Sequence, residues 1–180
     1  MSTSSATATP IRHEALEAWV SEAFSRVGLD GARAAAESLV LADTFGVHTH
    51  GTKLLPGYLA KLRAGGYRPD ARPRVVREGP GFAVVDGAAS LGQVGCRFGI
   101  DLGVEKARNV GVAYVGVRNT GHIGAAGGWA VRAALAGCFA LVVGNDAPSV
   151  AAAGSRGPVL GSNPLAWAAP VPGAIRCSST

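Results

Sequence analysis

Apolar positions over residues 11–64 repeat at the three- and four-residue spacing of a helix. They predict a first helix from residue 11, closed by a glycine turn at residues 26–31, whose buried face carries Leu16, Trp19, Val20 and Phe24. A second helix is expected over residues 32–44 and a third over residues 54–64. Between these two helices lies a polar turn at residues 46–51. The first third of the chain is therefore predicted to be helical.

The pattern changes after this point to short β-branched runs that alternate with helical periods. Residues 68–80 are rich in proline and arginine, which indicates a linker or an extended edge segment. Strands and turns are expected at 82–87, 112–117 and 139–144, with helices at 93–109 and 125–136. This strand–helix order predicts an α/β fold.

The remaining residues complete the predicted organisation. Residues 147–164 are typical of a Gly/Pro/Ser loop, 165–169 form a last apolar run, and 173–176 should enter a further strand. We divide the chain into a disordered leader (1–10), a helical subdomain (11–72) and an α/β domain (73–180). The chain is expected to stop inside that last domain, which would leave it truncated.

Composition narrows the classes of protein. The 180 residues are 48% hydrophobic and 16% charged, which argues against disorder, and a net charge of +5 suits an anionic metabolite. The arginines are scattered without a basic block or alternating aromatics, so no nucleic-acid partner is expected. No apolar run approaches the ~20 residues of a membrane span. Widely spaced Cys96, Cys138 and Cys177, with no secretory signal, predict a cytoplasmic protein with reduced thiols.

The polar turn at 46–51, Gly-Val-His-Thr-His-Gly, is the first candidate site. Thr49 and His50 can share a hydrogen bond, and together with His48 they could form a catalytic cluster. The alternative is structural: Thr49 or Thr52 caps the following helix and the histidines are partly exposed.

His122 is the second candidate, because it lies in a glycine-rich turn between a strand and a helix. It could be a general acid and base near neutral pH, a metal ligand, or a turn residue bonded to a carbonyl. Asn145 and Asp146 end the following strand. If the two strands are parallel neighbours, Asp146 and His122 share one crevice; otherwise Asp146 forms an ordinary Asx turn.

Two cofactor patterns fail on the sequence. The glycines at 121, 124, 127 and 128 lack the Gly-x-Gly opening of a Rossmann site, so that fold is rejected. A metal site would combine His48, His50 and His122 with Asp146. The histidine pair has no carboxylate nearby, however, and no helical metal motif supports it. We therefore predict no metal.

Five motifs in order resemble the type-2 malate/L-lactate dehydrogenase family, which includes ureidoglycolate and sulfolactate dehydrogenases and diketogulonate and piperideine-2-carboxylate reductases. They are the turn at 46–51, the leucine-rich helix with Tyr58, Ala-Val-Val-Asp-Gly at 83–87 with Gly92-Gln93, Val-Arg-Asn-Thr-Gly-His-Ile-Gly at 117–124, and Gly-Ser-Asn-Pro at 161–164. The resemblance covers about residues 11–170, roughly the N-terminal half of a family member.

The resemblance implies a non-Rossmann α/β fold of the malate/L-lactate dehydrogenase type and hydride transfer between NAD or NADP and a small 2-hydroxy or 2-oxo acid. It implies that His122 exchanges the substrate proton and that Thr49 and His50 lie near the substrate. Further contacts are assigned to the cofactor (Asp146, Asn145, Gly124, Asn163) and to the substrate (Tyr58, Lys53). It also implies a homodimer, or a partner chain that supplies the missing half.

Two departures from the family pattern concern substrate and completeness. A common arginine four residues after His50 is replaced by Leu54, beside Lys53, and a lysine does not grip a carboxylate bidentately. The ending Arg176-Cys-Ser-Ser-Thr offers no aspartate where relatives have one. The alternative function is a catalytically inactive truncated homologue that acts only as a dimerisation or interaction fragment.

Overall fold

The computed structural model describes residues 10–179, and its first part is helical, as the periodicity predicts. The predicted leader lies outside the described residues except for Pro10. Two short 3-10 turns link the second and third helices. The elements are α1 (His13–Ser25), α2 (Ala32–Thr44), η1 (His48–His50), η2 (Thr52–Leu54) and α3 (Leu55–Arg63).

The three helices enclose one apolar cluster. Val20, Phe24 and Leu39 are fully buried in it, and Leu62 of α3 packs with them. Burial of a large aliphatic or aromatic side chain contributes about 1.5–3 kcal/mol, so these residues hold the helical layer together. Trp19, expected on the same face, is instead 62% exposed, because the described part of the chain has no element over that side of α1.

A three-stranded sheet follows, in the order β1-β2-β3. Its strands are β1 (Arg74–Gly79), β2 (Phe82–Ser90) and β3 (Tyr114–Thr120), and α4 (Gly92–Val110) connects the last two. β1 is an antiparallel edge strand, so the edge interpretation holds for residues 74–79 of the predicted segment 68–80, while residues 68–73 form no strand. β2 is parallel to β3 and continues beyond the turn expected at residue 87. Ala88 and Ala89 take left-handed backbone angles that shift the register, and pairing resumes between Ser90 and Thr120.

The last strands form a separate antiparallel sheet against α5 (Ala126–Leu135). Its strands are β4 (Ala140–Val143), β5 (Leu165–Val171) and β6 (Ala174–Ser179). Small buried residues such as Ala130, Ala134 and Ala168 allow the close approach of helix and sheet. The α/β class is confirmed, but the expectation that β3 and β4 are parallel neighbours is wrong, since β4 pairs with β5.

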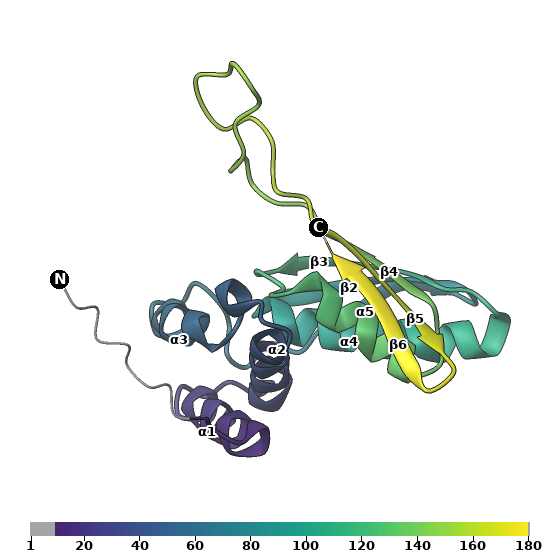
Figure 1. Ribbon diagram of the computed structural model, residues 1–180, viewed down its shortest axis with the longest axis horizontal. Coiled ribbons are helices and arrows are strands. Elements are labelled where there is room, and N and C mark those ends of the chain that lie inside the picture. The colour runs from purple at the N-terminus through teal and green to yellow at the C-terminus, as the bar shows by residue number, and fades with distance from the viewer. Residues whose placement is uncertain (1–9, 180) are drawn as a thin grey trace.

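Figure 1 shows the three N-terminal helices on one side and α4 and α5 beside the strands. The segment between β4 and β5 extends away from both sheets as a long loop, close in position to the predicted loop 147–164. Among residues 10–179, no helix is long and apolar enough to cross a membrane. Our proposed domain boundary at 72/73 stays a prediction.

Candidate active site

The turn after α2 is held by Asp43. Its carboxylate accepts hydrogen bonds from the Thr52 backbone N–H at 2.9 Å and from the Thr52 hydroxyl at 2.6 Å, and lies 3.1 Å from His48 Nδ1. A Cβ at Gly51 would collide with this carboxylate, so the turn requires glycine there. Burial, the largest single influence, raises the pKa of Asp43, but these hydrogen bonds and His48 together hold it below its usual value.

This arrangement corrects two expectations about the turn. α3 begins after Leu54 with no side-chain cap, and the Thr52 hydroxyl is bonded to Asp43 rather than to the helix. The histidine pair also has a carboxylate beside it, because α2 brings Asp43 back against His48. That contact spans five residues along the chain and depends on how the turn folds.

The turn brings His50 against His122. Thr49 Oγ1 lies 3.0 Å from His50 Nδ1, as the sequence predicted, and the rings of His50 and His122 lie with centroids 5.5 Å apart. His122 follows β3 in the turn before α5, where the strand pattern places it. Two segments separated by about seventy residues therefore meet through their imidazoles.

Tyr58 of α3 completes the contact from the buried side. Its hydroxyl lies 2.6 Å from His122 Nδ1, and its side chain is buried. Gln93, at the start of α4, is fully buried, and its Nε2 donates to the Tyr58 hydroxyl over 3.1 Å. Burial raises the pKa of Tyr58 to about 12, so the phenol keeps its proton at neutral pH.

His122 is an exposed residue, although Tyr58 and His50 contact its ring. Partial burial of the ring, the strongest influence, lowers the pKa of His122 below its ordinary value. His50 and Lys61 lower it further, while the negative charge of Asp146 opposes them. The imidazole is therefore predominantly neutral at neutral pH.

The loop after β4 provides the negative charge near His122. The carboxylate of Asp146 accepts hydrogen bonds from Ala147 N–H at 2.8 Å and from the Ser162 hydroxyl at 3.1 Å, and the backbone N–H of Asp146 donates to Asn163 Oδ1 at 3.1 Å. These bonds, the Ser162 bond foremost, hold the pKa of Asp146 below its usual value. The alternative of an Asx turn is wrong, because the carboxylate bonds to Ala147 N–H and the second residue on is Pro148, which has no N–H. Asp146 still influences the pKa of His122, although β3 and β4 lie in different sheets.

The other predicted site residues are placed less closely. Gly124 is buried in the turn that follows His122, with φ +75°, and a Cβ there would lie 3.4 Å from Gln93 Nε2. Asn145 is exposed beside Asp146. Lys53 is exposed on η2, and no hydrogen bond or ion pair among the described residues joins it to the histidines. The resemblance alone supports Asn145 and Lys53 as contacts.

The three-histidine metal arrangement is not assembled. His48 points to Asp43 with a side chain that is 74% exposed, while His50 faces His122. Within residues 10–179 no group of three or more His, Cys, Asp or Glu side chains is placed to hold a metal ion.

Sequence reasoning missed Asp43 and the role of Gln93. Gln93 was noticed only as part of a motif, and its place at the start of a helix resembles a surface position. A signal was available in Tyr58, since a buried tyrosine hydroxyl normally finds hydrogen-bond partners. Which residues provide them depends on three separate elements packing together.

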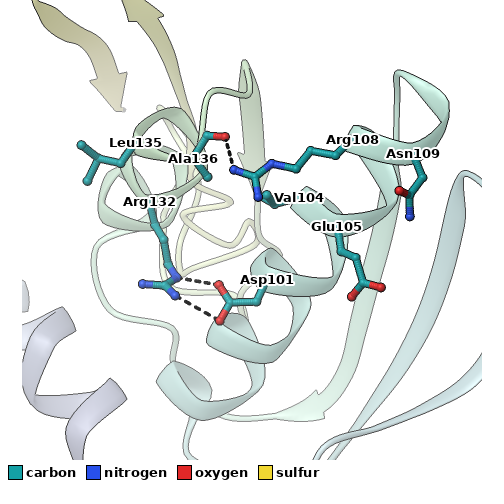
Figure 2. A pocket seen from close by; sticks show the side chains of 8 residues that line it. All are labelled: Asp101, Val104, Glu105, Arg108, Asn109, Arg132, Leu135 and Ala136. Atoms are coloured by element: carbon teal, nitrogen blue, oxygen red, sulfur yellow. Dashed lines mark hydrogen bonds and ion pairs between the residues drawn. The ribbon is translucent and has the colours of Figure 1, made fainter.

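A hollow of about 530 Å³ lies between α4 and α5, away from the histidine site, with which it shares no lining residue. Figure 2 shows that its arginines are already paired: Arg132 binds both oxygens of Asp101, and Arg108 donates to the carbonyl of Ala136. With these donors occupied, the hollow presents no free cluster for an anionic ligand. The histidine site is the stronger candidate for chemistry.

The fold and site together define an α/β protein with a polar centre built from a histidine after a parallel strand and a second histidine from a helical layer. Comparison with known proteins assigns this α/β protein to a family. The model of the malate/L-lactate dehydrogenase family matches residues 11–176, and the chain belongs to that family.

Individual relatives agree with this assignment. The chain is 38% identical to a malate dehydrogenase of Pyrococcus abyssi over 144 residues, 80% of this chain and 40% of that protein. It is 33% identical to the NAD(+) ureidoglycolate dehydrogenase of Escherichia coli strain K12 over 162 residues, 89% of this chain and 46% of that protein. Among solved structures, malate dehydrogenase from Pyrococcus horikoshii superposes with a TM-score of 0.89 at 32% identity, covering 96% of this chain and 50% of that one.

The chain thus spans about half the length of the relatives that it matches. The predicted family and its α/β fold are confirmed.

Proposed function

We propose that this chain carries the proton-transfer half of a dehydrogenase site that moves a hydride between NAD or NADP and a small 2-hydroxy or 2-oxo acid. The observation that carries the proposal is the accessible imidazole of His122, fixed by Tyr58 at 2.6 Å and packed beside His50. Family membership supports a substrate of this class, since relatives act on malate and ureidoglycolate by name.

In the proposed reaction His122 is the group through which a proton reaches or leaves the substrate oxygen. Reduction of a 2-oxo acid adds a hydride to the carbonyl carbon and a proton to its oxygen, and His122 regains its proton from solvent. Oxidation reverses both transfers. Because its pKa is lowered, the resting ring of His122 is mostly neutral; it must first take a proton from solvent to donate in reduction, and the neutral ring accepts the substrate proton in oxidation.

The neighbouring turn is proposed to bind the substrate. Thr49 and His50 offer a hydroxyl and an imidazole next to His122, and Tyr58 closes the site from the buried side. We propose Lys53 as the positive charge for the carboxylate, in place of the usual arginine. A lysine is a point charge without the bidentate fork, so we expect looser discrimination among acids.

The hydrogen-bonding groups near His122 fit a nicotinamide cofactor. Asp146 presents an exposed carboxylate that accepts hydrogen bonds, which is what ribose hydroxyls and a carboxamide require. We propose that Asp146 holds the cofactor together with Asn145, Gly124 and Asn163. When bound, the nicotinamide supplies or accepts the hydride. The NAD(+) dependence in the name of one relative supports this class of cofactor.

Two measurements test the proposal on the 180-residue chain. Fluorescence titration with NADH and NADPH should show saturable binding of at least one, and turnover should follow with a panel of 2-oxo acids. His122→Ala should lower turnover about 10²–10⁴-fold and leave cofactor affinity unchanged. His13→Ala, on the exposed start of α1, is the matched control. Full turnover in His122→Ala, or a folded chain that binds neither cofactor, would overturn the proposal.

One observation favours the second candidate, an inactive interaction fragment. Phe139, just before β4, and Leu141 and Val143 within it expose 66%, 58% and 64% of their surface, and their alternate positions place them on one face of the strand as an apolar stripe. Sedimentation of the chain with and without NADH separates the two candidates. Self-association without cofactor binding would favour the fragment.

A further inference from the structure

Gln93 is a fully buried polar side chain whose purpose the proposed reaction does not yet explain. It stands in the first turn of α4, and its Nε2 donates to the Tyr58 hydroxyl, while its Oε1 is buried without a hydrogen-bond partner among residues 10–179. A buried amide with one unpaired oxygen costs stability, so an apolar residue would suit the core better. The cost points to a role at the site.

The direction of each hydrogen bond follows from the chemistry of the three groups. An amide Nε2 can only donate, so the Tyr58 oxygen must accept from Gln93. The phenol proton is then left to donate along the 2.6 Å contact to His122 Nδ1. A nitrogen that accepts this bond carries no proton. In the neutral ring the proton therefore resides on Nε2, which makes no hydrogen bond among the described residues.

The surroundings keep this chain of bonds in place near neutral pH. The phenol stays protonated because burial raises the pKa of Tyr58 to about 12. The imidazole stays largely neutral because partial burial, then His50 and Lys61, lower the pKa of His122 against the opposing charge of Asp146. The phenol of Tyr58 and the imidazole of His122 therefore hold the protonation states that this series of hydrogen bonds requires.

We propose that Gln93, acting through Tyr58, is a positioning residue that fixes neutral His122 in the tautomer with its proton on Nε2. This inference rests on the proposed function, in which His122 serves the substrate oxygen. The site then offers a ring N–H that hydrogen-bonds the carbonyl oxygen of a 2-oxo acid, whereas oxidation would first require the ring proton to leave Nε2; this tautomer therefore favours the reduction direction. One net hydrogen bond favours this tautomer about tenfold over the other.

The test observes the ring nitrogens directly and needs no turnover. Long-range ¹H–¹⁵N correlation spectra of chain labelled with ¹⁵N-histidine report which nitrogen of each neutral imidazole is protonated, and His122→Asn assigns the signal. The expected result is a protonated Nε2 and a bare Nδ1 at His122. A dominant Nδ1–H form, or an even mixture, overturns the inference.

Variants separate Gln93 from a purely structural role. Gln93→Glu, nearly isosteric, replaces the donor by a carboxylate that accepts the phenol proton; Nδ1–H of His122 should then donate to Tyr58, and the tautomer should reverse. Tyr58→Phe should give a mixture and raise the titration midpoint of His122, since the bond that favours the neutral ring is gone. Tyr67→Phe removes a nearby hydroxyl that has no bond to His122 and should change neither.

The outcomes also distinguish this inference from the proposed function. A wild-type tautomer on Nε2 that Gln93→Glu leaves unchanged refutes the role of Gln93 while His122 chemistry stands. Should Gln93→Glu unfold, the wild-type spectrum and Tyr58→Phe still decide. Absence of cofactor binding refutes the proposed function but does not alter the spectrum.

Discussion

Removal of the Asp43 carboxylate should destabilise the chain and disorder the histidine turn. Asp43→Ala deletes two hydrogen bonds to Thr52, at 2.6 and 2.9 Å, and the contact with His48 at 3.1 Å. A hydrogen bond to a charged group contributes about 1.5–3 kcal/mol. The His48 contact contributes little, because that side chain is 74% exposed.

The two Thr52 bonds share one carboxylate oxygen, and the Asp43 side chain is 18% exposed, so their contributions are not fully additive. We expect a loss of about 2–3 kcal/mol in the free energy of unfolding. For a domain of this size, that lowers Tm by about 5–10 °C. Urea unfolding followed by circular dichroism measures the loss. Asp70→Ala, which removes an exposed partner of Arg68, should cost less than about 0.5 kcal/mol.

The pH dependence gives an independent check. The folded-state pKa of Asp43 lies below the unfolded value, so its contribution is complete above the unfolded pKa and is lost as pH falls through the folded one. The difference in stability between wild type and Asp43→Ala should therefore shrink in acid. The reasoning is refuted if Asp43→Ala costs less than about 0.5 kcal/mol, or if a double-mutant cycle with Thr52→Val shows no coupling.

Two further predictions concern packing and the ion pairs. A Cβ at Gly92 would collide with the carbonyl oxygens of Gly121 and His122, so Gly92→Ala should lower the free energy of unfolding in urea by about 1–3 kcal/mol and weaken substrate turnover. Gly57→Ala is the control, because a Cβ there meets open space. A loss for Gly92→Ala no larger than that for Gly57→Ala would contradict the packing. Arg132→Ala breaks its bonds to Asp101 and should cost about 1 kcal/mol at low salt and less at 1 M salt; equal loss at both salt concentrations would count against an electrostatic role.

The family resemblance and the strand–helix order were both readable along the chain. Helical spacing places Val20 and Phe24 in the core, and the β-branched run before His122 places that residue at the end of a strand. These features depend on neighbours within one element. The same spacing misplaced Trp19, because periodicity shows which face of a helix is apolar and not how much of that face a partner covers.

Contacts across elements were beyond the sequence pattern. Tyr58 contacts His122, 64 residues further along the chain, and it also contacts Gln93, 35 residues further along. No local sequence rule relates residues at these separations. The pairing of β4 with β5 instead of β3 is of the same kind, since an apolar strand suits either sheet.

The amino-acid sequence by itself determined the helical start, the α/β order, the family and the position of His122. Each follows from side-chain spacing or a motif within a short segment. Only the tertiary structure decided that Asp43 holds the histidine turn, that Gln93 is buried and that Tyr58 joins it to His122. The physical reason is that a hydrogen bond requires donor and acceptor about 3 Å apart, and only packing of separate helices and strands brings those atoms together.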